Sequence, residues 1–128
     1  PDMLHSKILF ADRPHARLNR IDVSKAEAAP GVIAVFTAAD VPCNEYGLIM
    51  PDQPVLVGPG SDMPGADVAR FVGDQVAFIV AETERQAEAA CGLIELDWEE
   101  SSFSDYYRLY EGNRLVFDNL NDSILKEF

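Results

Sequence analysis

The feature that most constrains the fold of this chain is the shortness of its apolar runs, which proline, glycine and aspartate repeatedly interrupt. The two longest runs, near residues 31–39 and 76–81, fall far short of the ~20 residues that cross a bilayer. Short β-branched runs between turn residues are typical of β-strands. Two helix-start signals lie among these runs. The sequence therefore predicts an α+β domain, with a small mixed or antiparallel sheet and two short-to-medium helices.

The N-terminal residues predict two strands joined by a turn. Leu4, Ile8 and Phe10 share one parity of the stretch 3–11, which predicts a half-buried strand with these side chains facing inward. Pro14 marks the turn, and residues 16–23 resume the extended pattern with one break in parity that indicates a bulge. We expect these two strands to pair antiparallel.

Two capping boxes predict the two helices. Ser24 with Glu27 marks the first start, and Pro30 is expected to end that helix after barely two turns. Thr83 with Gln86 marks the second start. The apolar face that follows at helical spacing consists of Ala87, Ala90, Cys91 and Ile94. Most of these side chains are small, so we expect the second helix to lie close to a sheet.

Further strands are expected in three places. Residues 32–36 form a β-branched run that predicts a buried strand. The stretches 68–71 and 76–81 flank a turn and predict a tight hairpin with a buried second arm, in which Gly73 supplies a positive φ. Residues 94–98 alternate apolar and acidic side chains, which predicts a last strand with its apolar face inward.

The stretch 40–67 differs from the rest of the chain in kind. It holds five of the eight prolines and four of the eight glycines, with one short strand expected at 54–57. Loops of this length in compact domains are usually functional or pack against another body.

The last residues differ again. We expect a domain over residues 1–100, followed at 101–128 by an aromatic-rich docking tail or a linker to a missing cofactor domain. This tail holds six of the twelve aromatic residues, whereas disordered segments are poor in aromatics. The chain begins at Pro1 rather than Met, so we expect it to be a piece of a longer protein.

The charge balance limits the choice of partner. Acidic residues number 22 against 10 basic ones, for a net charge of −12. Nucleic acid and anionic membrane surfaces both demand clustered Lys and Arg, so neither is expected as a partner. The sequence has no N-terminal targeting signal, and Cys43 and Cys91 stand too far apart to suggest a disulfide framework. A cytoplasmic location is therefore expected.

Several single residues are site candidates, and for each the sequence favours a structural role. His5 and His15, with Asp12 as a third ligand, match no strong metal-ligand spacing. Lys25 resembles the lysine of lipoyl or biotinyl carriers, but its capping box places it on a helix rather than at a hairpin tip. Cys91 is expected in the core, whereas Cys43 could react only if exposed.

Two longer segments are candidates of the same kind. Residues 58–61 are glycine-rich, but they lack the ending of a phosphate-binding loop and are expected to form a flexible turn. No glycine-flanked serine of a nucleophile elbow is present. The acidic series that could bind a cation, but is expected to form a solvated surface, is Glu82, Glu84, Glu88, Glu95, Asp97, Glu99 and Glu100. The sequence thus assigns no catalytic, cofactor-binding or metal residue.

Several short motifs, taken in order, carry a family resemblance across residues 3 to about 100. They are Met3-Leu4-His5-Ser6-Lys7-Ile8-Leu9, Arg13-Pro14-His15-Ala16-Arg17-Leu18, Ile21-Asp22-Val23-Ser24-Lys25-Ala26, Pro30-Gly31-Val32-Ile33-Ala34-Val35-Phe36-Thr37-Ala38, Asp40-Val41-Pro42, Pro51-Asp52-Gln53-Pro54-Val55-Leu56, Arg70-Phe71-Val72-Gly73-Asp74-Gln75-Val76-Ala77 and Val80-Ala81-Glu82-Thr83. This set resembles the N-terminal α/β-hammerhead domain of the molybdopterin-binding large subunit of the xanthine dehydrogenase/aldehyde oxidase family.

The resemblance implies an oxidoreductase that hydroxylates a purine, aldehyde or N-heterocycle with oxygen from water. It implies a molybdopterin cofactor, iron–sulfur clusters and in some members a flavin in the complete enzyme. The partners implied are a downstream molybdopterin-binding domain and iron–sulfur or flavin subunits. The family's cofactor and catalytic motifs lie downstream, so the isolated chain is expected to be inactive and to hold no cofactor. The alternative is a stand-alone hammerhead domain acting as a non-enzymatic interaction or assembly module. Self-association is a further expectation for the isolated chain.

Overall fold

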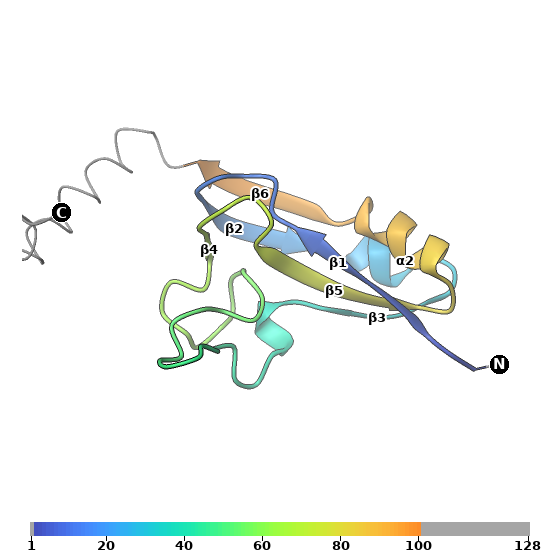
Figure 1. Cartoon of the computed structure of the whole chain (residues 1–128). Helices are drawn as coiled ribbons and strands as arrows, with labels where there is room; N and C mark the ends of the chain where they lie inside the picture. Colours follow the sequence, from blue (N-terminus) through green and yellow to red (C-terminus); the bar gives the residue numbers. More distant parts are fainter. Residues whose placement is uncertain (1, 101–128) are drawn as a thin grey trace, which may run out of the picture.

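Two antiparallel sheets of three strands each form the framework in the computed structural model, which describes residues 2–100 (Figure 1). The elements in chain order are β1 (His5–Phe10), β2 (Ala16–Asp22), α1 (Ser24–Glu27), β3 (Val32–Phe36), the 3-10 turn η1 (Ala38–Asp40), β4 (Val68–Ala69), β5 (Gln75–Ala81), α2 (Glu84–Cys91) and β6 (Glu95–Glu100). One sheet has the order β1-β5-β3 and the other β4-β2-β6. The predicted α+β class, with antiparallel sheet and two helices, is confirmed.

β5 is the central strand of the first sheet because its residues are apolar on both faces. Val76, Ala77, Ile79 and Ala81 are completely buried, as expected of a strand flanked on both edges and covered by other elements. β1 and β3 pair with β5 on either side, both antiparallel. The prediction of a buried strand at this position is confirmed.

Two predicted pairings are wrong, and in each case neighbouring strands belong to different sheets. β1 pairs with β5, whereas β2 pairs with β4 and β6. β4 likewise pairs with β2 and forms no hairpin with β5. The turn between β4 and β5 moves the chain from one sheet to the other, and Asp74 fixes it by accepting a 2.7 Å hydrogen bond from the Arg70 backbone. Gly73 has φ of 105° there, which confirms its predicted positive φ.

The inward parity predicted for the first strand is also wrong. Leu9 packs against the helix-side core, while Phe10 is half exposed. The sequence predicts a buried strand at β3, but β3 is an edge strand in which only Val35 is buried. The predicted bulge in the second strand is confirmed between Leu18 and Arg20, where the register with β6 shifts.

One predicted helix cap is confirmed and the other is wrong. The Thr83 side chain accepts a hydrogen bond from the Gln86 backbone N–H, as expected at a helix start. Ser24 instead lies inside α1, where its hydroxyl and its backbone N–H both donate to the Asp22 carboxylate at 2.6 and 3.1 Å. Asp22 is the stronger acceptor, and α1 is a single turn of four residues rather than two turns.

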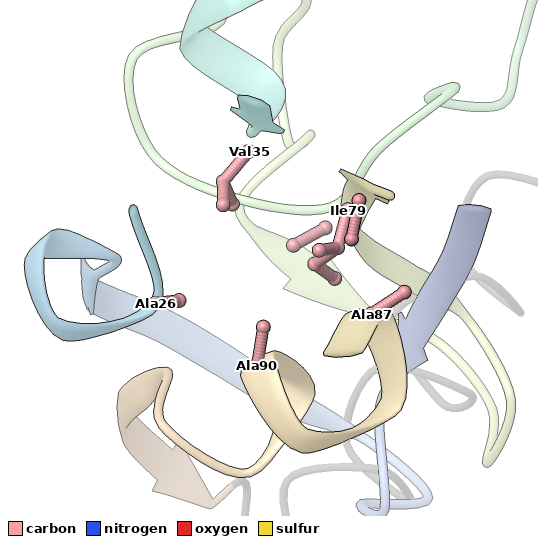
Figure 2. Close-up of a cluster of buried hydrophobic side chains, with 7 residues drawn as sticks. Ala26, Val35, Ile79, Ala87 and Ala90 are labelled. Atoms are coloured by element: carbon pink, nitrogen blue, oxygen red, sulfur yellow. The ribbon is translucent and has the colours of Figure 1, made fainter. Parts of the chain in front are cut away.

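The first core cluster lies between the helices and the β1-β5-β3 sheet. Figure 2 shows Ala87 and Ala90 of α2 directed at Ile79 of β5, with Ala26 of α1 and Val35 of β3 around them. The small alanine face lets α2 approach the sheet closely, as predicted. Cys91 and Ile94 are partly buried at its edge.

A second cluster joins the two sheets. Leu18 of β2 and Val76 of β5 are its largest fully buried members beside Val57 of the long loop. Leu96 and Trp98 of β6 pack against it while their acidic neighbours are exposed, which confirms the predicted apolar-in alternation. The loop before β4 is therefore tied into the core.

Two predictions remain predictions. The docking tail expected at 101–128, and with it the domain boundary near residue 100, lie outside the described residues. Within the part that the structure describes, no helix is long and apolar enough to cross a membrane.

Candidate functional site

The loop between η1 and β4, residues 41–67, is the largest irregular part of the described chain. The strand predicted at 54–57 is absent there; an isolated bridge joins Tyr46 and Gln53 instead, with backbone hydrogen bonds of 2.8 and 3.1 Å. Val57 N–H donates to the Gln75 carbonyl oxygen at 2.7 Å, which attaches the loop to β5. The loop is thus long but held at defined points.

Asn44 is the buried polar side chain that organises this loop. Its amide nitrogen donates to the Leu56 carbonyl oxygen at 2.8 Å and to Ser61 Oγ at 3.0 Å. Its amide oxygen accepts from the Leu56 N–H at 2.8 Å. One side chain therefore satisfies both backbone groups of a buried residue, the role that a neighbouring strand usually has.

At the start of the loop, Asp40 closes the 3-10 turn. Its carboxylate accepts from the Thr37 backbone N–H at 2.7 Å and from the Thr37 hydroxyl at 2.9 Å. Thr37 is itself buried. This cap fixes the direction in which the chain leaves β3 and enters the loop.

The far end of the loop presents an apolar tip, defined as residues 46–50. Leu48 and Ile49 are fully exposed, and Tyr46 and Met50 are at least half exposed. Gly47 permits the tight turn, because a Cβ there would lie 1.7 Å from the Met50 carbonyl oxygen. Contiguous exposed apolar side chains on a braced loop are typical of a contact with another protein surface.

Two shallow hollows lie in the same loop. One, of about 350 Å³, is surrounded by residues 58–67, and the other, of about 210 Å³, by residues 41–45 and 62–64. Their charged lining side chains are all carboxylates: Glu45, Asp62 and Asp67. The lining of the two hollows thus contains no Lys or Arg to bind an anion, which supports the interpretation of the glycine-rich segment 58–61 as a turn rather than a phosphate loop.

The two histidines do not meet. His5 begins β1 opposite Ala81, whereas His15 precedes Ala16, which pairs with Ala69 and Glu100 in the other sheet. Asp12 forms an ion pair with Arg13 at 3.4 Å. Among residues 2–100 no group of three His, Cys, Asp or Glu could hold a metal ion.

Lys25 lies on α1, as predicted, and belongs to an ion-pair network. It pairs with Glu95 of β6, and this hydrogen bond raises the pKa of the lysine. Arg20 lies 3.7 Å from the Asp22 carboxylate and 3.9 Å from Glu95. The hydrogen bonds from Ser24 lower the pKa of Asp22. The network links α1 to the β2–β6 pair and suits a structural role better than a carrier role.

The acidic residues take the exposed places expected of them, whereas Cys91, predicted in the core, lies only partly buried at its edge. Both cysteines are free thiols; Cys43 is exposed in the loop, and partial burial raises the pKa of Cys91. The acidic series occupies exposed positions of α2, β6 and the turn before α2. Several of its members form ion pairs, including Glu84 with Lys7 at 3.8 Å and Glu100 with Arg13 at 3.0 Å.

Sequence reasoning singles out the long loop but misses the residues that matter in it. The apolar triplet Leu48-Ile49-Met50, between Gly47 and Pro51, gives no decisive signal, because Leu56 and Val57 of the same loop are also apolar and yet are buried. Asn44 gives no signal either, since only the folded loop shows which backbone groups it meets.

Comparison with known proteins places this architecture among large oxidoreductases. A family model described as "Aldehyde oxidase and xanthine dehydrogenase, a/b hammerhead domain" matches residues 1–102. One of the probable xanthine dehydrogenase subunits of Bacillus subtilis is 42% identical over 106 residues, which are 82% of this chain and 13% of that protein. The nicotinate dehydrogenase large molybdopterin subunit of Eubacterium barkeri is 36% identical over 101 residues, 78% of this chain and 22% of the relative.

Solved structures give the same result. Carbon monoxide dehydrogenase from Oligotropha carboxidovorans aligns with a TM-score of 0.68 at 35% identity, covering 79% of this chain and 12% of that one. Aldehyde oxidoreductase from Desulfovibrio gigas aligns with a TM-score of 0.63 at 32% identity, with the same coverage of 79% and 12%. The chain thus spans less than a quarter of these relatives' lengths.

Proposed function

Since this chain belongs to the a/b hammerhead domain family of aldehyde oxidases and xanthine dehydrogenases, we propose that it serves as a non-catalytic N-terminal domain of a molybdenum hydroxylase. Its relatives are oxidoreductases, and one is named as a large molybdopterin subunit. The complete enzyme would hydroxylate a purine, aldehyde or N-heterocycle with oxygen from water. It would work in the cytoplasm, and the free thiols of Cys43 and Cys91 suit a reducing compartment.

The two hollows in the long loop do not support a molybdopterin site within the described residues. The cofactor carries a phosphate, and the only charged side chains lining the two hollows are carboxylates. No cluster within residues 2–100 has the donor set for a metal ion. These observations support assigning the cofactor, together with iron–sulfur clusters and any flavin, to other domains or subunits.

The apolar tip is the observation that carries the proposed role. Leu48 and Ile49 are as exposed as side chains can be, yet Asn44 and the Tyr46–Gln53 bridge hold their loop in one conformation. Exposed apolar side chains on an ordered loop lose little conformational entropy when a partner covers them. We therefore assign the tip to the contact with the downstream molybdopterin-binding domain or an accessory subunit.

A domain exchange tests this role. The matching segment of the Bacillus subtilis relative is replaced by the aligned residues of this chain, and molybdenum content and subunit assembly are measured on the purified complex. We expect the exchanged enzyme to assemble and load molybdenum. With Leu48→Ser and Ile49→Ser we expect assembly roughly tenfold weaker, because losing a buried apolar anchor at an interface typically costs more than ~1 kcal/mol.

The matched control is Glu45→Gln with Asp52→Asn, two exposed polar positions of the same loop, which should assemble like the unmodified exchange. Equal assembly of the tip variant and the control would remove the tip from the interface. An exchanged enzyme that folds but takes up no molybdenum would favour the alternative, a stand-alone interaction module.

A further inference from the structure

The second core cluster buries Val76 on the face of the β1-β5-β3 sheet opposite the helices, but other apolar side chains of that face are only partly covered within residues 2–100. Lys7 and Leu9 face α2 and the helix-side core, so strand alternation puts their neighbours on the opposite side. The register places Ile8 beside Phe78 and Phe36 beside Phe78. We call this surface the outer face; the register gives its members as Ile8, Ala34, Phe36, Phe78 and Val80. Phe10 joins them by alternation along β1, although a register shift after Leu9 pairs it with Gln75.

The outer face is aromatic and half open to solvent. Phe10 is 51% exposed and Phe36 is 42% exposed, while the Phe36 and Phe78 rings lie 6.3 Å apart. Both helices lie on the other side of the sheet (Figure 1). Ile8 and Phe10, which the sequence predicts as core-facing, belong to this outer face instead. Such a pattern is expected when a further segment covers the strand.

The chain leaves the described region beside one end of the outer face. Glu100, the last residue of β6, forms a 3.0 Å ion pair with Arg13, three positions after Phe10. The turn that carries exposed Phe71 and Val72 is joined to the same corner, where Gly73 N–H donates to the Ala11 carbonyl oxygen at 2.9 Å. The C-terminal end of β6 therefore lies next to the Phe10 end of the apolar surface.

The next ten residues have the composition and the reach to cover it. Residues 101–110 contain Phe103, Tyr106, Tyr107 and Tyr110, with one acidic and one basic residue. Extended, ten residues span up to ~35 Å, whereas the six residues of β1 span only ~20 Å. The segment has no net charge, so the acidic domain does not repel it. Two copies of the whole chain, each with a net charge of −12, repel one another, which disfavours covering the outer face with a second copy.

We propose that the aromatic side chains of residues 103–110 fold back onto the outer face of the same chain. Each aromatic side chain can bury ~150–250 Å². Attachment at Glu100 makes the contact intramolecular, with an effective concentration on the order of millimolar, which favours it over association between chains. The proposal concerns only these 128 residues and does not depend on the proposed enzyme.

The test uses the full chain in solution. Nuclear Overhauser effects should connect the Phe36 or Phe10 ring protons with the rings of Tyr106 or Tyr107. Backbone relaxation of residues 103–110 should match that of the strands. With Phe103, Tyr106 and Tyr107 replaced by Ser, binding of an apolar dye should rise severalfold, because the outer face becomes exposed.

The control variant Phe117→Ser with Phe128→Ser alters later aromatics of the same tail, and its dye binding should equal that of the unmodified chain. Both variants change only residues beyond β6, so the described fold stays intact as the reference. Fast backbone motion of residues 103–110 or unchanged dye binding in the triple variant would overturn the proposal. So would sedimentation of the chain as a dimer, if the ring contacts disappear when the dimer is diluted to monomer.

Discussion

Asn44 shows how much of the functional loop depends on one residue. Its side chain pairs with the backbone of Leu56 as a neighbouring strand would. It makes three hydrogen bonds of 2.8–3.0 Å, so neither its amide nitrogen nor its amide oxygen is left without a partner. The apolar tip begins two residues later, so its position depends on these hydrogen bonds. A substitution there should therefore act on stability and on the tip together.

We expect Asn44→Ala to lower the free energy of unfolding by about 1–3 kcal/mol, because it leaves the Leu56 N–H and carbonyl buried and unpaired. The control is Asn19→Ala, whose exposed amide makes only a 3.4 Å hydrogen bond to Glu99 and should cost less than ~0.5 kcal/mol. Urea denaturation of both variants measures the difference. Equal midpoints would show that water replaces the Asn44 hydrogen bonds.

Asp22 gives the fold a defined pH dependence. Hydrogen bonds from Ser24 lower the pKa of this carboxyl below its ordinary 3.8. A lowered folded-state pKa means that the stabilisation is present above the unfolded pKa and is lost as pH falls through the folded one.

Ser24→Ala should therefore raise the Asp22 pKa toward 3.8, as followed by carbon NMR of the carboxyl. The difference in the free energy of unfolding between this variant and the unmodified chain should be largest at about pH 5. It should shrink as the pH falls below the ordinary carboxyl pKa of 3.8. Ser6→Ala, on an exposed position of β1, is the control. A difference that widens in acid would contradict the assignment.

At the scale of elements, the alanine face of α2 sets how closely the helix lies on the sheet. Ala87 is completely buried in the cluster that contains Ile79 (Figure 2). Ala89 on the same helix is exposed. We expect Ala87→Leu to destabilise by about 1–3 kcal/mol through overpacking, and Ala89→Leu to change stability by less than ~0.5 kcal/mol. Thermal or urea unfolding measures both, and similar values would mean that α2 can shift outward freely.

The sequence predicts elements better than it predicts their pairing. Strand and helix positions follow from local patterns, and the Thr83 cap and the Leu18–Arg20 bulge are found that way. Pairing is not local: the turns after Phe10 and after Arg70 resemble hairpin turns, but each moves the chain between sheets. The Ser24 cap fails because the Ser24 hydroxyl and N–H donate to the Asp22 carboxylate, while the Glu27 N–H donates to the Val23 carbonyl oxygen instead of to Ser24.

At the scale of the whole molecule, the described residues support family membership, and the non-catalytic role stays a proposal. The order of short motifs predicts the family, which the match over residues 1–102 confirms. The apolar tip and the outer face cannot be located beforehand, because an apolar residue in the sequence does not show whether it faces a core or a partner.

The isolated 128-residue chain should contain no stoichiometric molybdenum and oxidise no aldehyde or purine, since the hollows it offers are lined by carboxylates. Elemental analysis of the purified chain, with an intact xanthine dehydrogenase as positive control, measures this. One molybdenum per chain after dialysis would place a cofactor site in this domain.

The way the strands are shared between the two sheets also has a consequence for synthesis on the ribosome. β1 pairs with β5, and β2 pairs along its length with β6. Each of these two early strands therefore has a partner that lies far along the described chain. Contacts this distant in sequence make folding slow, because the long intervening chain must close before any pairing stabilises it. We therefore expect the β4-β2-β6 sheet of the nascent domain to stay incomplete until β6 has emerged, which leaves apolar side chains of β2 open to aggregation during that interval.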